Sequence, residues 1–111
     1  MIELDTSQAP DVAVIRPQGR LTMVHAGDLR AVVGEVIADG RTRIVVDLGD
    51  CEFLDSSGLG AVIGGLKAAR QAGGDLRIAA LQPQVMTVLK LTNLDRVLRP
   101  YATPEAAADG W

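Results

Sequence analysis

The chain has 111 residues, of which 48% are apolar and 23% are charged, and its formal net charge is −3. These values are typical of one globular domain, which we expect to span residues 1–111. The acidic balance, without any run of Lys and Arg, argues against a nucleic-acid partner.

Short apolar runs predict strands along the chain. We expect strands at residues 2–5, 12–16, 43–48, 75–80 and 97–99, because these runs are mostly apolar or β-branched and end near Gly, Pro or Asp. The run at 43–48 is apolar enough for a buried parallel strand.

Apolar residues at helical spacing predict helices between these strands. The first helix carries Leu29, Val32, Val33, Val36 and Ile37 and ends before Gly40. We expect the next helix to begin near Ser56 or Ser57 and to end before Gly73. A third begins at Pro83 and runs to about Leu91, and a short last helix is capped at Thr103.

This alternation predicts an α/β fold with a mixed, mostly parallel sheet of four to five strands. Parallel strands that alternate with helices need right-handed crossovers. In such sheets, functional sites lie at the carboxyl ends of strands, in the loops that lead into helices. The segment 55–58 is a loop of this kind.

Single residues limit the chemistry. Cys51 is the only cysteine and His25 the only histidine, which excludes an intrachain disulfide and leaves too few ligands for a typical zinc site. We therefore expect no metal site. We also expect no cofactor and no catalytic residues. No run reaches the apolar length of a membrane span, and segment 1–11 is unlike a signal peptide. We expect a cytoplasmic protein without direct membrane insertion.

The stretch FLDSSGLGAVIGG, residues 53–65, is the unusual motif of the chain. Asp55 or Ser56 could cap the helix that begins there. Glycine inside a helix costs about 1 kcal/mol relative to alanine, yet Gly60, Gly64 and Gly65 fall inside this one. Either close packing on the sheet or a bare surface for a partner chain would offset that cost.

Two known glycine motifs do not fit this stretch. A phosphate-binding P-loop needs Lys directly after its last glycine, but Leu66 follows Gly65. The dinucleotide fingerprint fails at Ile63. A nucleophile elbow around Ser56 would need glycine where Leu54 stands.

A serine at a helix start is well placed for phosphorylation. A phosphate there gains hydrogen bonds from free backbone N–H groups and favourable interaction with the helix dipole. It also adds about −1.5 to −2 charge, which would repel or desolvate a docked partner. Such a switch needs no large conformational change.

The segment Asp55-Ser56-Ser57-Gly58-Leu59-Gly60, with VVDLGDCEFL before it and VIGGLKAARQAGGDLRIA after it, closely resembles the bacterial anti-sigma factor antagonists, the single-domain STAS proteins. The resemblance covers nearly the whole chain. It implies a STAS fold with helices packed mainly on one side of the sheet.

The resemblance also implies a function. Such proteins bind an anti-sigma factor, usually a serine kinase, and so release a sigma factor; they have no catalysis of their own. The kinase phosphorylates the residue that matches Ser56, which ends binding, and a serine phosphatase restores it. The implied partner-binding residues are Arg20, Thr22, Met23, Val24, Asp55, Ser57, Gly58, Leu59 and Gly60.

The chain departs from the family at one segment. Many members carry G-E-[LI]-D where this chain has Gly19-Arg20-Leu21-Thr22, so an acidic residue is replaced by Thr22 and Arg20 reverses a charge. One hypothesis is weaker phosphorylation or a different partner. Another is that Arg20 holds a phosphate on Ser56.

Two other functions remain open from the sequence. The chain could be the STAS subunit of a membrane transport complex that binds an ATPase, or a nucleotide-binding sensor module. The intact Asp-Ser-Ser-Gly-Leu-Gly segment and the lack of an apolar tail favour the antagonist.

Overall fold

A five-stranded sheet forms the centre of the protein in the computed structural model, which describes residues 2–109 and 111. The strands, in spatial order, are β1 (Ile2–Asp5), β2 (Val12–Pro17), β4 (Arg43–Asp47), β6 (Asp75–Ala79) and β7 (Pro100–Tyr101). β1 is antiparallel to β2, and all other neighbours are parallel. The predicted α/β fold with a mixed, mostly parallel sheet is confirmed.

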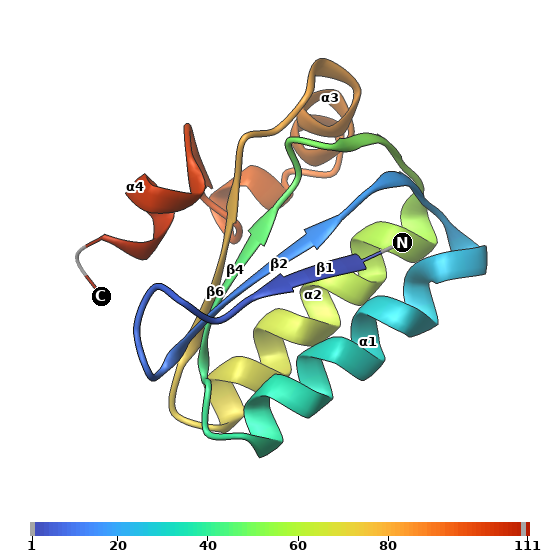
Figure 1. Ribbon diagram of the computed structural model, residues 1–111. Coiled ribbons are helices and arrows are strands. Elements are labelled where there is room, and N and C mark those ends of the chain that lie inside the picture. Colours follow the sequence, from blue (N-terminus) through green and yellow to red (C-terminus); the bar gives the residue numbers. More distant parts are fainter. Residues whose placement is uncertain (1, 110) are drawn as a thin grey trace.

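Two long helices, α1 (Met23–Ala38) and α2 (Ser56–Gln71), lie side by side along one face of this sheet (Figure 1). α3 (Pro83–Leu91) follows β6, and the short α4 (Pro104–Ala108) packs against β4 and β6 on the other face. Gly40, just beyond α1, has φ of 85°, as expected of a residue that ends a helix in the left-handed region. The predicted caps at Gly40 and Thr103 are therefore confirmed.

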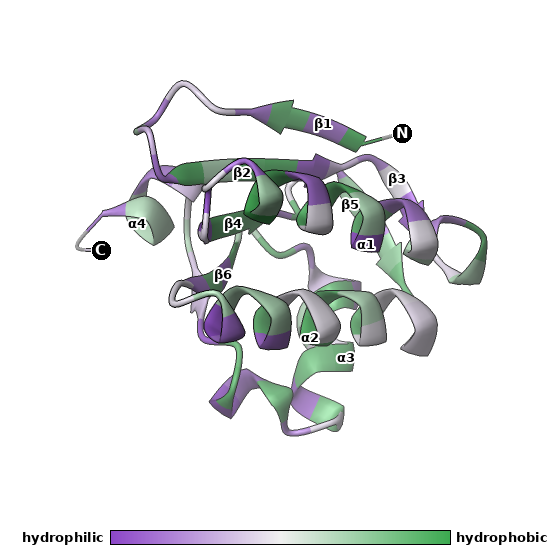
Figure 2. Cartoon of the chain, turned by 90° about the horizontal axis from the view of Figure 1, so that it is seen from below, coloured by the Kyte–Doolittle hydropathy of each residue, from purple (hydrophilic) through white to green (hydrophobic). Residues whose placement is uncertain are grey.

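Alternating residues of the central strands separate two cores. Ala13 and Ile15 of β2 face the large core beneath α1 and α2, whereas Val14 between them packs with Ala107 of α4. β4 alternates in the same way and is strongly hydrophobic between its charged ends, Arg43 and Asp47 (Figure 2). A strand covered on both faces reads as a continuous apolar run, which is why these strands were recognisable in the sequence.

A separate two-stranded parallel sheet leads into the long helices. It pairs β3 (Gly19–Leu21) with β5 (Cys51–Leu54), and sequence reasoning did not predict either strand. β3 is only three residues long, and β5 carries an exposed Glu52, so neither shows a continuous apolar run. Their pairing depends on tertiary contact and not on local pattern.

The predicted strand at residues 97–99 is wrong. A 3₁₀ turn, Leu94–Arg96, occupies the chain just before it, and the backbone N–H of Leu98 donates to the Leu94 carbonyl at 2.7 Å. This helical hydrogen bond turns buried Leu98 inward, and the strand forms later, at Pro100 and Tyr101.

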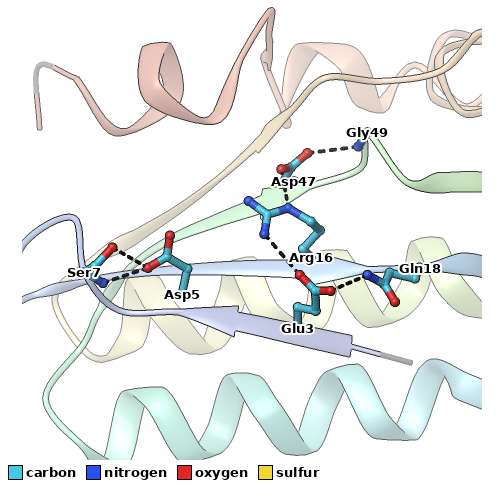
Figure 3. Close-up of polar contacts among 7 residues, drawn as sticks. All are labelled: Glu3, Asp5, Ser7, Arg16, Gln18, Asp47 and Gly49. Carbon is cyan, nitrogen blue, oxygen red and sulfur yellow. Dashed lines mark hydrogen bonds and ion pairs between the residues drawn. The ribbon is translucent and has the colours of Figure 1, made fainter.

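A polar network ties the edge of the sheet to its centre (Figure 3). Arg16 of β2 donates through Nε to Asp47 of β4 at 2.8 Å and through Nη1 to Glu3 of β1 at 3.4 Å. The hydrogen bond that Arg16 donates to the Asp47 carboxylate raises the pKa of Arg16. The other oxygen of Asp47 accepts from the Gly49 backbone at 2.9 Å, so this buried carboxylate is satisfied on both sides.

Cys51 is expected to stay unreactive in the folded protein. Its thiol is buried at the start of β5, and burial raises its pKa. The nucleophile is the thiolate, which a buried thiol with a raised pKa rarely forms. Ellman's reagent at pH 8 should therefore react with native protein only at the rate at which the fold opens around Cys51, and with denatured protein at once. Immediate labelling of native protein would contradict this burial.

The buried thiol also makes stability depend on pH. Because the pKa of Cys51 is raised in the folded state, the free energy of unfolding should fall as pH rises through the ordinary thiol range, above about 8.5.

Candidate functional site

The starts of α1 and α2 lie next to each other because the strands that precede them are paired. Leu21, the last residue of β3, lies opposite Leu54, the last residue of β5. Each of the two strands is followed two residues later by the first residue of its helix. The backbone N–H of Asp55 continues this pairing by donating to the Leu21 carbonyl at 3.3 Å. Parallel pairing thus brings two helix N-termini, with their free N–H groups, to one end of the molecule.

Asp55 bonds to both helix starts. Its Oδ1 accepts from the Gly58 backbone N–H at 2.8 Å, which caps α2. Its Oδ2 lies 3.3 Å from the Met23 backbone nitrogen, the first residue of α1. Thr22, the N-cap residue of α1, makes no side-chain cap bond. Of the two predicted caps, Asp55 and Ser56, the structure selects Asp55.

Asp55→Ala is expected to lower the free energy of unfolding by about 1–2 kcal/mol, because both helix starts lose an acceptor. Asp55→Asn, which retains an acceptor oxygen, should recover most of this loss. Asp50→Ala serves as the control, since Asp50 is exposed in the loop before β5. Urea unfolding followed by circular dichroism measures all three variants. Equal stability of Asp55→Ala and wild type would contradict the double cap.

Ser56 is the first residue of α2 and is exposed, whereas Ser57 is half-buried. Within the described residues, the hydroxyl of Ser56 takes part in no hydrogen bond, so it is free to react or to contact another molecule. This position lies at the positive dipole end of α2, where the N–H groups of Ser56 and Ser57 have no partner within the helix and that of Gly58 is bonded to Asp55.

The glycines of the motif divide into two classes. At Gly58 a Cβ atom would overlap the carbonyl oxygen of Leu21, and at Gly65 it would lie 3.1 Å from Leu76 Cδ1 and 3.3 Å from Val33 Cγ2. Gly60 and Gly64 are exposed, and a Cβ at Gly64 would meet nothing within 4 Å. Packing therefore accounts for one pair and leaves the other pair as bare surface.

Two residues expected to contact a partner are not accessible for it. Gly58 and Leu59 are buried, because the first turn of α2 packs against the end of β3 and over the core. This corrects the expectation: these two residues position the start of α2 and do not form its surface. Gly60, one position further, is exposed.

Met23 and Val24 form an exposed apolar pair at the start of α1. Their exposed fractions are 77% and 76%, and because the two residues are adjacent they form a small apolar patch. Thr22 is half-buried beside them. We call Met23, Val24, Ser56 and Gly60 the helix-start surface. Arg20, on β3, lies over the ring of Phe53 on β5, with its guanidinium carbon 4.2 Å from the ring centroid.

Gln84 supports the site, and sequence reasoning missed it. From the first turn of α3, its side-chain amide accepts from the Leu54 N–H at 2.9 Å and donates to the Leu54 carbonyl at 3.1 Å. This pair of bonds holds the end of β5 directly before Asp55. A half-buried glutamine thirty residues away leaves no local signal in the sequence.

The described residues hold no group of three or more His, Cys, Asp and Glu side chains that could bind a metal ion. Across the same described part of the chain, no helix is long and apolar enough to cross a membrane.

The chain is similar to known proteins over most of its length. Residues 3–107 match the family model described as "STAS domain". The anti-sigma-F factor antagonist RsfB of Mycobacterium tuberculosis is 30% identical over 101 residues, covering 89% of this chain and 80% of that protein. This name describes a regulatory protein and not an enzyme.

Solved structures give the same result. The anti-sigma factor antagonist SpoIIAA in its unphosphorylated form superimposes with a TM-score of 0.83 at 27% identity, covering 98% of this chain and 94% of that chain. The Bacillus cell fate determinant SpoIIAA in its phosphorylated form superimposes with a TM-score of 0.76 at 26% identity, covering 98% and 97%.

Proposed function

Because the chain belongs to the STAS domain family, we propose that it is an anti-sigma factor antagonist that binds a serine-kinase anti-sigma factor and so releases a sigma factor. Relatives of this name match it over most of their length. The observation that carries the proposal is an exposed, unbonded Ser56 at the start of α2, beside the exposed apolar pair Met23 and Val24. This arrangement suits a docking surface with a modifiable centre.

In this proposal, the partner kinase phosphorylates Ser56 and a serine phosphatase removes the phosphate. The phosphate is tolerable inside the fold because the first-turn N–H groups of α2 and the helix dipole favour an anion there. The same phosphate would prevent the partner from binding, because about −1.5 to −2 of charge would be buried in the interface next to the Asp55 carboxylate. The switch therefore acts on binding and leaves the fold intact.

The remaining site residues have distinct roles in this proposal. Met23, Val24 and Gly60 contact the partner. Asp55 holds the two helix starts in register, and Thr22 and Ser57 border the contact. A sigma factor and its regulators work where transcription occurs, so we place the protein in the bacterial cytoplasm.

Direct binding tests the proposal. The purified protein is titrated by calorimetry with each anti-sigma factor kinase encoded by the same genome, and with the ATPase subunits of its transporters. We expect one kinase to bind with a Kd of about 1 µM or tighter. The same protein should displace the sigma factor from that kinase. Binding to a transporter ATPase alone, or to none of these proteins, would overturn the proposed function.

A further inference from the structure

Arg20 is a positively charged residue that no acidic side chain of the described residues neutralises. It is exposed on β3, and it takes part in none of the ion pairs found among the described residues. Every other arginine of the sheet strands, namely Arg16, Arg43 and Arg77, makes an ion pair or a hydrogen bond to the chain. Arg20 is therefore available to another molecule.

The position of the Arg20 guanidinium is defined by Phe53. The two residues are paired across β3 and β5, and the guanidinium carbon lies 4.2 Å from the ring centroid. A guanidinium held over a ring can still donate its N–H groups to a carboxylate. Because the side chain is already held, less conformational entropy is lost when that edge is bound.

A surface hollow connects Arg20 to the helix-start surface. It has a volume of about 440 Å³, and both Arg20 and Val24 line it. Glu52 lines the same hollow but forms no ion pair with Arg20. The hollow thus presents an unpaired cation and a separate carboxylate beside an exposed apolar side chain.

We infer that Arg20 selects the partner by charge: the protein that docks here presents a carboxylate-bearing segment to Arg20, next to apolar side chains that cover Met23 and Val24. This inference rests on the proposed function and states the chemistry of the partner's surface. Charge complementarity of this kind mainly sets specificity and the association rate.

The same partner chemistry accounts for the direction of the switch. A partner surface that is acidic enough to pair with Arg20 also repels a phosphate on Ser56. Both residues lie at the same end of the molecule, since Arg20 is three residues before the start of α1, Ser56 begins α2, and Asp55 joins the two helix starts. One acidic partner segment therefore serves both recognition and release.

Charge-reversal variants test the inference on the kinase that binds wild-type protein. Arg20→Glu should weaken binding by about tenfold or more, with Arg20→Ala in between, and the loss should shrink as salt is raised from 0.05 to about 0.5 M. Arg70→Glu is the matched control. Arg70 is exposed and lies fourteen residues after Ser56 on α2, which places it about 20 Å away along the helix. This variant should change the affinity less than twofold.

A change of opposite sign separates charge from local damage. Glu52→Lys should tighten binding about threefold or more at low salt. Glu35→Lys is the control, because Glu35 is an exposed residue of α1 outside the hollow, and it should change the affinity little. Thermal unfolding of each variant checks that the fold persists. Equal affinities of Arg20→Glu and Arg70→Glu, or weaker binding by Glu52→Lys, would overturn the inference while the proposed function stands. If wild type binds no kinase, both fall together.

Discussion

Ser56→Asp is expected to weaken binding of the anti-sigma factor by about a hundredfold or more, whereas Ser56→Ala should bind like wild type. The exposed hydroxyl belongs to the helix-start surface, so a charge placed there is desolvated when the partner docks. Like-charge contact and desolvation in an interface cost several kcal/mol, and about 2.7 kcal/mol corresponds to a hundredfold. Calorimetric titration of both variants against the same kinase measures the effect.

A matched charge elsewhere on α2 serves as the control for this experiment. Gln71→Asp adds the same charge at the last residue of the helix and should alter the affinity little. Equal affinity of Ser56→Ala and Ser56→Asp would remove the charge switch from the account, although the binding function could stand without it.

Gly58→Ala is expected to destabilise the protein by about 3 kcal/mol, the largest effect of any single methyl group in the motif. The added Cβ would overlap the Leu21 carbonyl oxygen and would approach Leu54 Cδ1 to 2.9 Å. The first of these atoms belongs to the backbone of β3, so it cannot rotate away. Relief requires β3 and α2 to separate, which would also stretch the cap between Asp55 and Gly58.

Gly64→Ala provides the matched comparison, because it adds the same methyl group to the same helix. At Gly64 the Cβ meets nothing within 4 Å, so only the gain in helix propensity remains, up to about 1 kcal/mol of stabilisation. Thermal melts should therefore move in opposite directions, with Gly58→Ala lower by on the order of 10 °C. A Gly58→Ala protein as stable as wild type would show that α2 does not pack this closely on β3.

The elements that sequence reasoning identified are those whose pattern is local. The buried strands β2 and β4 read as apolar runs, and α1 and α2 carry apolar residues at helical spacing that the structure places inward. Pro83 and Thr103 mark helix starts through backbone chemistry that depends on only a few neighbours.

The parts that escaped sequence reasoning depend on distant partners. β3 and β5 exist because they pair with each other, thirty or more residues apart. The second bond of Asp55, to Met23, and the amide bonds of Gln84 to Leu54 are equally non-local. The division of the glycines into packed and bare positions likewise required the position of Leu21 and Val33 relative to α2.

Intact-mass spectrometry shows whether the partner kinase phosphorylates the protein at Ser56. The protein is incubated with the kinase that binds it and ATP, beside Ser56→Ala, and the phosphorylated product is then titrated with fresh kinase. We predict a gain of one phosphate on wild type, none on Ser56→Ala, and loss of binding by the phosphorylated form. An unmodified wild type, an equal gain by Ser56→Ala, or undiminished binding after phosphorylation would show that Ser56 is not the phosphorylation switch.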